Sequence, residues 1–183
     1  MTRQPHAHCH FCGAEQSDRT YPRTCLTCGG MVWDNPVPVA VVCAPMRVEE
    51  RVGLLVIRRG IEPGKGKLAL VGGFCESHET WQQNGAREVR EETGIEVDPA
   101  GLEGFWFVST HPRPNRVLLF STAPESDASA APGFEPNTET EERGVVFGPD
   151  GLDAMFAFDL HAEAARRWFA ERGATGPHDY RAF

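Results

Sequence analysis

The chain has 183 residues, enough for one domain with a small appendage, and 40% of them are hydrophobic, as is ordinary for a globular protein. Its formal net charge of −8 and pI of about 5.4 argue against non-specific binding to nucleic acid or an acidic membrane surface, because both require a basic face. No stretch approaches the ~18 consecutive apolar residues of a membrane span, and the first residues lack an apolar signal core, so we expect a cytoplasmic protein.

The first 33 residues contain two C-x-x-C-G pairs and few aliphatic residues, so they could not bury a core unaided. In a reducing compartment such pairs indicate a metal site rather than disulfides. Four thiolates can close a tetrahedral Zn²⁺ site, and the candidates are Cys9, Cys12, Cys25 and Cys28. A closed site has no open coordination position, so we predict a structural zinc ribbon over residues 1–33, with redox activity as the alternative.

A second domain is predicted over residues 34–183, because the prolines of "WDNPVP" force an extended boundary. Hydrophobic patterning and turn residues predict strands at 39–45, 51–59, 67–71, 101–110, 116–123 and 144–149. Helices are predicted after the glycine turn at 72–73 and at 159–173, with a long surface loop over 124–142 and last ten residues that are loose or pack late. This order favours an α/β sandwich with a mixed sheet.

The segment "GGFCESHETWQQNGAREVREETGI" (72–95) carries the most informative helix. Thr80 and Gln83 fit a capping box, and Gly94 is a natural helix stop. At ~100° per residue, the carboxylates at 88, 91 and 92 share one face of the helix. Like charges at this spacing repel, and a hard divalent cation such as Mg²⁺ or Mn²⁺ removes that repulsion. The alternative is a solvated surface helix rich in Glu and Arg.

The wider spacing resembles the Nudix box, G-x5-E-x7-R-E-U-x-E-E-x-G-U, in which U is aliphatic. Every fixed position is present in this chain, at Gly73, Glu79, Arg87, Glu88, Val89, Glu91, Glu92, Gly94 and Ile95. The resemblance implies an α/β/α sandwich that uses divalent metal to cleave a nucleoside diphosphate linked to a moiety X.

The resemblance also implies roles for individual residues. The metal ligands would be Glu88, Glu91 and Glu92, with the Gly72 carbonyl as a further ligand. Glu79 and Arg87 would form an ion pair that holds the loop on the helix, and Gly73 would permit the sharp turn. Many family members take their general base from a later loop, and "TETEER" offers Glu139, Glu141 and Glu142. We favour Glu141 among these three, and a solvated acidic loop is the alternative.

Residues outside the box could contact the substrate. Arg58 and Arg59 end a predicted strand, and Arg113 and Arg116 lie in or beside the Pro-rich loop "HPRPNR". Arg58 and Arg59, or Lys65 and Lys67 in the loop that follows them, could reach phosphates, although ordinary surface charge is the alternative. Arg113 and Arg116 could shape a pocket. Trp106 could stack on an adenine ring, although aromatic residues in strands more often belong to the core.

A zinc ribbon before the box is similar to two groups, the NADH pyrophosphatases and the ribbon-bearing pyrophosphatases of FAD and ADP-ribose. "STHPRPNRV" (109–117) does not match the element that usually follows the box in the NADH group. We therefore expect metal-dependent hydrolysis of FAD, ADP-ribose or an NADH-like dinucleotide, with release of a nucleoside monophosphate. The alternatives are a nucleotide-sensing or partner-binding module, and a house-cleaning pyrophosphatase of nucleoside triphosphates. A homodimer is possible, as in ribbon-bearing relatives.

Overall fold

The computed structural model describes residues 7–18, 20–110 and 115–183, which form two compact units, Met1–Pro36 and Val37–Phe183. The first unit contains one small antiparallel sheet of β1 (Arg23–Thr24) and β2 (Met31–Val32). Its hydrophobic core consists of Cys9, Cys25 and Val32, with Tyr21 packed against them. A core this small cannot offset the conformational entropy that the unit loses on folding, so a further stabilising element is needed.

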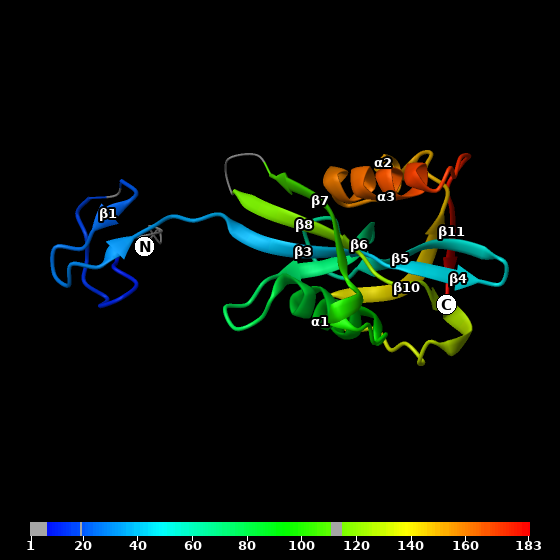
Figure 1. The fold of residues 1–183 in the computed structure, drawn as a ribbon, viewed down its shortest axis with the longest axis horizontal. Helices are drawn as coiled ribbons and strands as arrows, with labels where there is room; N and C mark the ends of the chain where they lie inside the picture. Colours follow the sequence, from blue (N-terminus) through cyan, green and yellow to red (C-terminus); the bar gives the residue numbers. More distant parts are fainter. Residues whose placement is uncertain (1–6, 19, 111–114) are drawn as a thin grey trace. The chain divides into compact units, whose positions relative to one another are not determined.

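The second unit is built around one mixed sheet (Figure 1), in which the strands follow the order β11-β10-β5-β6-β3-β8-β7. Outside this order, β4 pairs with β5, and β9 pairs with β4. The strands are β3 (Val37–Cys43), β4 (Pro45–Val48), β5 (Arg51–Arg59), β6 (Leu68–Phe74), β7 (Glu103–Ser109), β8 (Arg116–Thr122), β9 (Ser126–Asp127), β10 (Thr140–Phe147) and β11 (Asp179–Ala182). The pairs β3–β8 and β4–β9 are parallel, and the other pairs are antiparallel.

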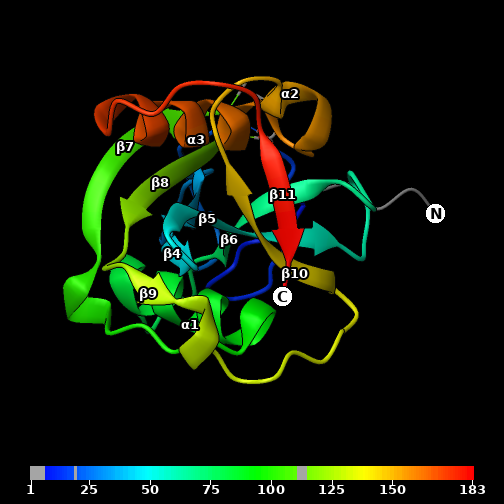
Figure 2. The ribbon, with the colours of Figure 1, turned by 90° about the vertical axis from the view of Figure 1, so that its right-hand side faces the viewer.

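Helices cover both faces of this sheet (Figure 2): α1 (Trp81–Thr93) lies on one face, and α2 (Leu152–Met155) and α3 (Asp159–Glu171) lie on the other. Two short 3-10 turns, η1 (Pro99–Gly101) and η2 (Ala128–Ala130), complete the unit. Successive side chains of a strand point to opposite faces of the sheet, so the core has two parts. Leu68 and Leu70 of β6 pack with α3, whereas Ala69 and Val71 pack with α1. The predicted α/β/α sandwich with a mixed sheet is therefore confirmed.

Several predicted segments differ from the structure. The predicted glycine turn at 72–73 is not a turn, because both glycines lie inside β6, which continues to Phe74. The apolar run at 39–45 is divided, because β3 ends at Cys43 and β4 begins at Pro45. The predicted loop over 124–142 contains β9 and η2 and runs into β10, which starts at Thr140 and pairs with β5 through an irregular register. The last ten residues are predicted to be loose or to pack late, and they are not loose, because β11 lies within them and pairs with β10.

The described part of the chain contains no helix that is both long and apolar enough to cross a membrane.

Candidate functional site

The carboxylate helix α1 has a defined start and end. Thr80 accepts a hydrogen bond from the Gln83 amide, and the Gln83 side chain accepts one from the Thr80 amide, so the predicted capping box is present. The helix ends at Gly94, which adopts a left-handed conformation with φ of 74° and donates to the Arg90 carbonyl. Both ends of the helix are thus fixed by side-chain or backbone hydrogen bonds.

Two glycines of β6 let this helix lie close against the strand. The Gly72 amide donates to Glu92 Oε2 at 3.0 Å. A Cβ atom on Gly73 would lie 2.4 to 2.7 Å from the carboxylate atoms of Glu88, closer than any real contact. Glycine at position 73 therefore provides the space that the Glu88 carboxylate occupies.

The burial of these carboxylates is electrostatically unfavourable. Glu92 is 6% exposed, and burial raises its pKa to about 8, although the Gly72 amide opposes the shift. Burial also raises the pKa of Glu88, although Arg87 favours its charged form. The charges of Glu88 and Glu139 add to the shift at Glu92. A divalent cation would stabilise the ionised forms, so these oxygen donors fit a metal such as Mg²⁺ or Mn²⁺.

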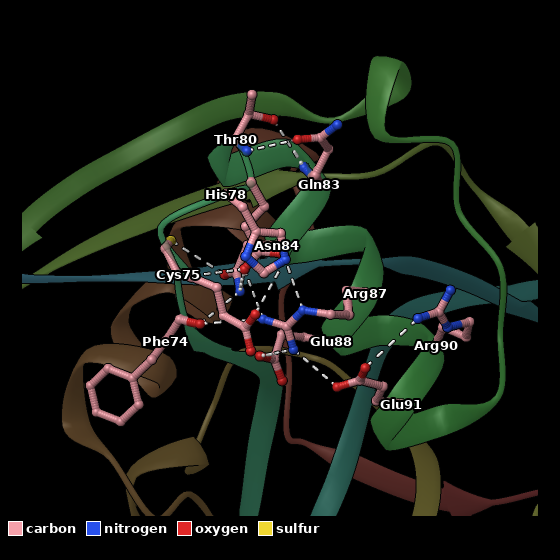
Figure 3. A network of polar contacts seen from close by, with 12 residues as sticks. Phe74, Cys75, His78, Thr80, Gln83, Asn84, Arg87, Glu88, Arg90 and Glu91 are labelled. Atoms are coloured by element: carbon pink, nitrogen blue, oxygen red, sulfur yellow. Dashed lines mark hydrogen bonds and ion pairs between the residues drawn. The ribbon is translucent and has the colours of Figure 1, made fainter.

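Arg87 is the centre of the polar network around the helix (Figure 3). Its guanidinium forms a two-point ion pair with Glu79, with Nη2–Oε1 at 2.9 Å and Nε–Oε2 at 3.1 Å. Nη1 also donates to Glu88 at 2.8 Å and to Glu91 at 2.9 Å. The hydrogen bonds from Arg87 lower the pKa of Glu79 to about 2. The Arg87 side chain therefore links the turn after β6 to two of the predicted metal ligands.

Asn84 also supports this turn, and the sequence analysis did not identify it. Its side-chain amide donates to Glu79 Oε1 and to the Phe74 carbonyl, both at 2.9 Å (Figure 3). Asn84 is fully buried on α1, one turn after the Thr80 cap. A polar residue on the sheet-facing side of the helix was the available signal, because a buried amide requires partners.

The three predicted ligands face an acidic cavity of about 200 Å³. Its lining residues are Glu88, Glu91, Glu92, Asn137, Thr138 and Glu139. Glu139 is thus the member of "TETEER" that lies with the predicted metal ligands.

The other two glutamates of that segment have different partners. Glu141 lies 3.6 Å from Lys65 and does not line the acidic cavity. Glu142 accepts from Arg58 Nε at 3.1 Å and from the Tyr180 hydroxyl at 2.5 Å. The structure therefore favours Glu139 over Glu141 as a candidate base.

A larger cavity of about 600 Å³ opens beside the carboxylates and shares Glu92 with the acidic cavity. Its wall is largely apolar and comes from β6, β8, the 59–63 segment and the start of α3. Two guanidiniums line it above aromatic rings: that of Arg116 lies 5.2 Å from the Phe74 ring centroid, and that of Arg59 lies 4.9 Å from the Phe158 centroid. We refer to it below as the nucleoside cavity, for the role proposed in the next section.

Of the candidate substrate contacts named from the sequence, Arg59 and Arg116 line this cavity. Arg58 pairs with Glu142, and Arg59 lines the cavity instead. Trp106 stacks on Phe120, with centroids 5.1 Å apart, and packs against the core, so it does not line the cavity. Arg113 lies outside the described residues.

The four cysteines of the first unit form a separate group of potential metal ligands. Cys9, Cys12, Cys25 and Cys28 place their Sγ atoms within 4.8 Å of one another. Each pair closes a similar turn, in which Gly13 donates to the Cys9 carbonyl and Gly29 donates to the Cys25 carbonyl, both at 2.8 Å. All four cysteines are free thiols in the structure, and their grouping is compatible with tetrahedral zinc.

This chain is similar to Nudix and MutT-like proteins in sequence and in structure. The family model described as NUDIX domain matches residues 36–171. A MutT-like protein of Streptomyces ambofaciens is 31% identical over 137 residues, which cover 71% of this chain and 86% of that protein. An ADP-ribose pyrophosphatase of Methanocaldococcus jannaschii is 44% identical over 48 residues, 26% of this chain and 28% of that protein. The crystal structure of a NUDIX hydrolase from Nitrosomonas europaea aligns with a TM-score of 0.68 and 27% identity, covering 92% of this chain and 96% of that one.

Proposed function

Because this chain belongs to the Nudix family of pyrophosphohydrolases, we propose that it hydrolyses the pyrophosphate bond of a nucleoside diphosphate linked to a second moiety and releases a nucleoside monophosphate. The observation that carries this proposal is the pairing of an acidic cavity with a larger apolar cavity through Glu92. A pyrophosphate at the acidic cavity would leave an attached nucleoside within reach of the larger one. FAD, ADP-ribose and NADH-like dinucleotides are the candidate substrates, and the ADP-ribose pyrophosphatase relative supports this choice.

The proposed metal ligands are the carboxylates of Glu88, Glu91 and Glu92 with the Gly72 carbonyl. The burial of Glu88 and Glu92 and the close approach of the glycine backbone support this set, and the exposed Glu91 lines the same acidic cavity. When bound, Mg²⁺ or Mn²⁺ would neutralise pyrophosphate charge and lower the pKa of a coordinated water. Arg87 would hold Glu88 and Glu91 in position, and its ion pair with Glu79 would fix the turn that follows β6.

Glu139 replaces Glu141 as our proposed general base, because it lines the acidic cavity. Its carboxylate would accept a proton from the attacking water as the water oxygen bonds to one phosphorus. The bridging P–O bond then breaks, and its electron pair stays on the oxygen of the departing phosphate. Charge compensation and positioning provide the catalysis, so a covalent nucleophile is not required.

The nucleoside cavity is proposed to hold the remainder of the substrate. Phe74 and Phe158 offer aromatic surfaces, and Arg59 and Arg116 offer donors for phosphate or ring atoms. Because these residues lie at both ends of the cavity wall along β6, either end could accept a planar ring. Arg58 and Trp106 are no longer proposed as substrate contacts.

The cysteine group is proposed to hold a structural Zn²⁺ through Cys9, Cys12, Cys25 and Cys28. The small core of the first unit supports this role, since metal coordination would stabilise its fold. A cytoplasmic location and a homodimer stay predictions from the sequence.

The direct test is a substrate screen with the full-length protein and Mg²⁺ or Mn²⁺. FAD, NADH, ADP-ribose, dinucleoside polyphosphates and nucleoside triphosphates would be incubated separately, and the products separated by chromatography. We expect a nucleoside monophosphate from at least one of the first three. Binding without hydrolysis of any of them would instead favour a nucleotide sensor, and exclusive hydrolysis of triphosphates would favour a house-cleaning enzyme.

A further inference from the structure

The turn that carries Glu139 is organised by one side chain, that of Asn137. Its Oδ1 accepts hydrogen bonds from the backbone amides of Glu139 and Thr140, both at 2.8 Å. The backbone amide of Asn137 also donates to the Thr140 carbonyl at 2.9 Å. This is a local Asx arrangement, of a kind that asparagine forms in many turns. On its own it would fix only the shape of the turn.

A second contact connects the turn to the carboxylate helix. Asn137 Nδ2 donates to the backbone carbonyl of Glu91 at 3.2 Å, across 46 positions of sequence. Glu91 lies in the last turn of α1, where carbonyls lack partners within the helix. Asn137 therefore satisfies a helix-terminal carbonyl of a proposed metal ligand while its oxygen holds the amide of Glu139.

The same turn is held from its other side by the end of β5. The Gly60 amide donates to the Glu139 carbonyl at 2.7 Å, and a Cβ atom on Gly60 would lie 2.7 Å from the Thr138 carbonyl oxygen. The turn is thus confined between Gly60 and the end of α1. The Asn137 side chain therefore joins the turn that carries Glu139 to the helix that carries the other three carboxylates of the acidic cavity.

We infer that Asn137 is a positioning residue, which sets the carboxylate of Glu139 relative to the metal-binding carboxylates of α1 by bonding both segments at once. This inference rests on the proposed function, in which Glu139 is the base. Misplacing a catalytic group by about 1 Å can lower a rate roughly 100-fold. Loss of the Asn137 side chain should therefore affect the reaction step and leave substrate binding largely intact.

The test uses the full-length protein with Mg²⁺ and three probes: ADP-ribose, FAD and NADH. For Asn137→Ala we expect kcat to fall roughly 10- to 100-fold, with KM changed less than about twofold. Asn137→Ser retains a hydroxyl acceptor for the local turn but is too short to reach the Glu91 carbonyl as well, so it should lose most of the same activity. Asp127→Ala is the matched control, because Asp127 makes a comparable local turn with Ser129 in β9 and η2. It should retain wild-type kcat.

The double variant Asn137→Ala/Glu139→Gln separates positioning from general destabilisation. If Asn137 acts through Glu139, the double variant should be no slower than Glu139→Gln alone. Additive losses, or a wild-type kcat in Asn137→Ser, would overturn the inference while leaving the proposed function standing. A wild-type protein inactive on all three probes would overturn the proposed function and this inference together.

Discussion

The backbone amide of Gly72 donates to the carboxylate of Glu92 at 3.0 Å, which joins the end of β6 directly to the last turn of α1. This bond places a carboxylate that is 6% exposed between two cavities, one acidic and one mostly apolar. The last part of β6 contains two glycines because a Cβ atom on Gly72 would lie 2.3 Å from the Ala40 carbonyl oxygen, and one on Gly73 would overlap the Glu88 carboxylate.

The first prediction concerns Gly73. In Gly73→Ala the new methyl group would overlap the Glu88 carboxylate, so either this side chain or the strand must move. Overpacking of this kind costs about 1–3 kcal/mol, and we expect a lower melting temperature and at least a tenfold loss of kcat. Gly133→Ala is the matched control, since a Cβ atom there meets nothing within 4 Å. Equal activity of the two variants would contradict the close approach.

The second prediction concerns Glu92 and metal binding. Burial already favours the neutral form of this side chain, so the neutral amide of Glu92→Gln should fold with nearly unchanged stability in the absence of metal. Mg²⁺ or Mn²⁺ should raise the melting temperature of the wild type and raise that of the variant much less, because a ligand stabilises only the state that binds it. We also expect turnover to fall by at least 100-fold. Exposed Glu96, mutated to Gln, serves as the control.

Full activity of Glu92→Gln, or an equal metal response in both variants, would refute the metal assignment.

The third prediction concerns His161, which lines the nucleoside cavity and lies within the core. Burial, helped by the charge of Arg59, lowers its pKa from 6.5 to about 3. Between these values the unfolded chain binds more protons, so the free energy of unfolding should decrease as pH falls through this window. In His161→Leu no imidazole is present to be protonated on unfolding, so the free energy of unfolding should decrease less as pH falls. Urea unfolding at several pH values between about 7.5 and 4 would measure it.

The exposed His78, mutated to Leu, provides the control for this experiment and should retain the wild-type pH dependence. If the free energy of unfolding of His161→Leu and of the wild type depended on pH identically, folding would not lower the pKa of His161.

The fourth prediction concerns the cysteine group. Purified protein should contain about one zinc per chain, and Cys28→Ser should lose it, because a tetrahedral site needs all four ligands. Chelation should then increase amide exchange in residues 7–36, whose small core cannot maintain the fold. Cys75→Ser should retain the metal, since Cys75 lies on the turn before α1. Zinc content measured by atomic absorption, independent of activity, decides between these outcomes.

The sequence predicted the helix of the site well because its signals are local. Thr80, Gln83 and Gly94 define its ends through hydrogen bonds to near neighbours, and the spacing of the glutamates alone determines which face they share. The same holds for β5, whose predicted and observed bounds coincide at 51–59. The order of these strands and helices along the chain was enough to predict the α/β sandwich.

The remaining features depend on contacts between distant segments. Nothing local distinguishes Arg58 from Arg59, and only the pairing of Arg58 with Glu142 shows which of the two is free to line the cavity. Likewise, pairing with β5 sets the start of β10 at Thr140, and the sequence does not show that Glu139 then lines the acidic cavity while Glu141 lies near Lys65. The final strand was missed because Tyr180 and its neighbours pair with β10 and have no strong pattern of their own.

The two cavities have one described residue in common, Glu92. The parts of the nucleoside cavity wall that come from β8, the 59–63 segment and the start of α3 do not line the acidic cavity, whereas Gly72 and Gly73 contact the carboxylates that do. In a lineage of such enzymes, new substrates could be acquired through changes in β8, the 59–63 segment and the start of α3, while the hydrolytic apparatus is inherited intact. For protein engineering the same separation recommends mutagenesis libraries restricted to Arg59, Arg116 and Phe158.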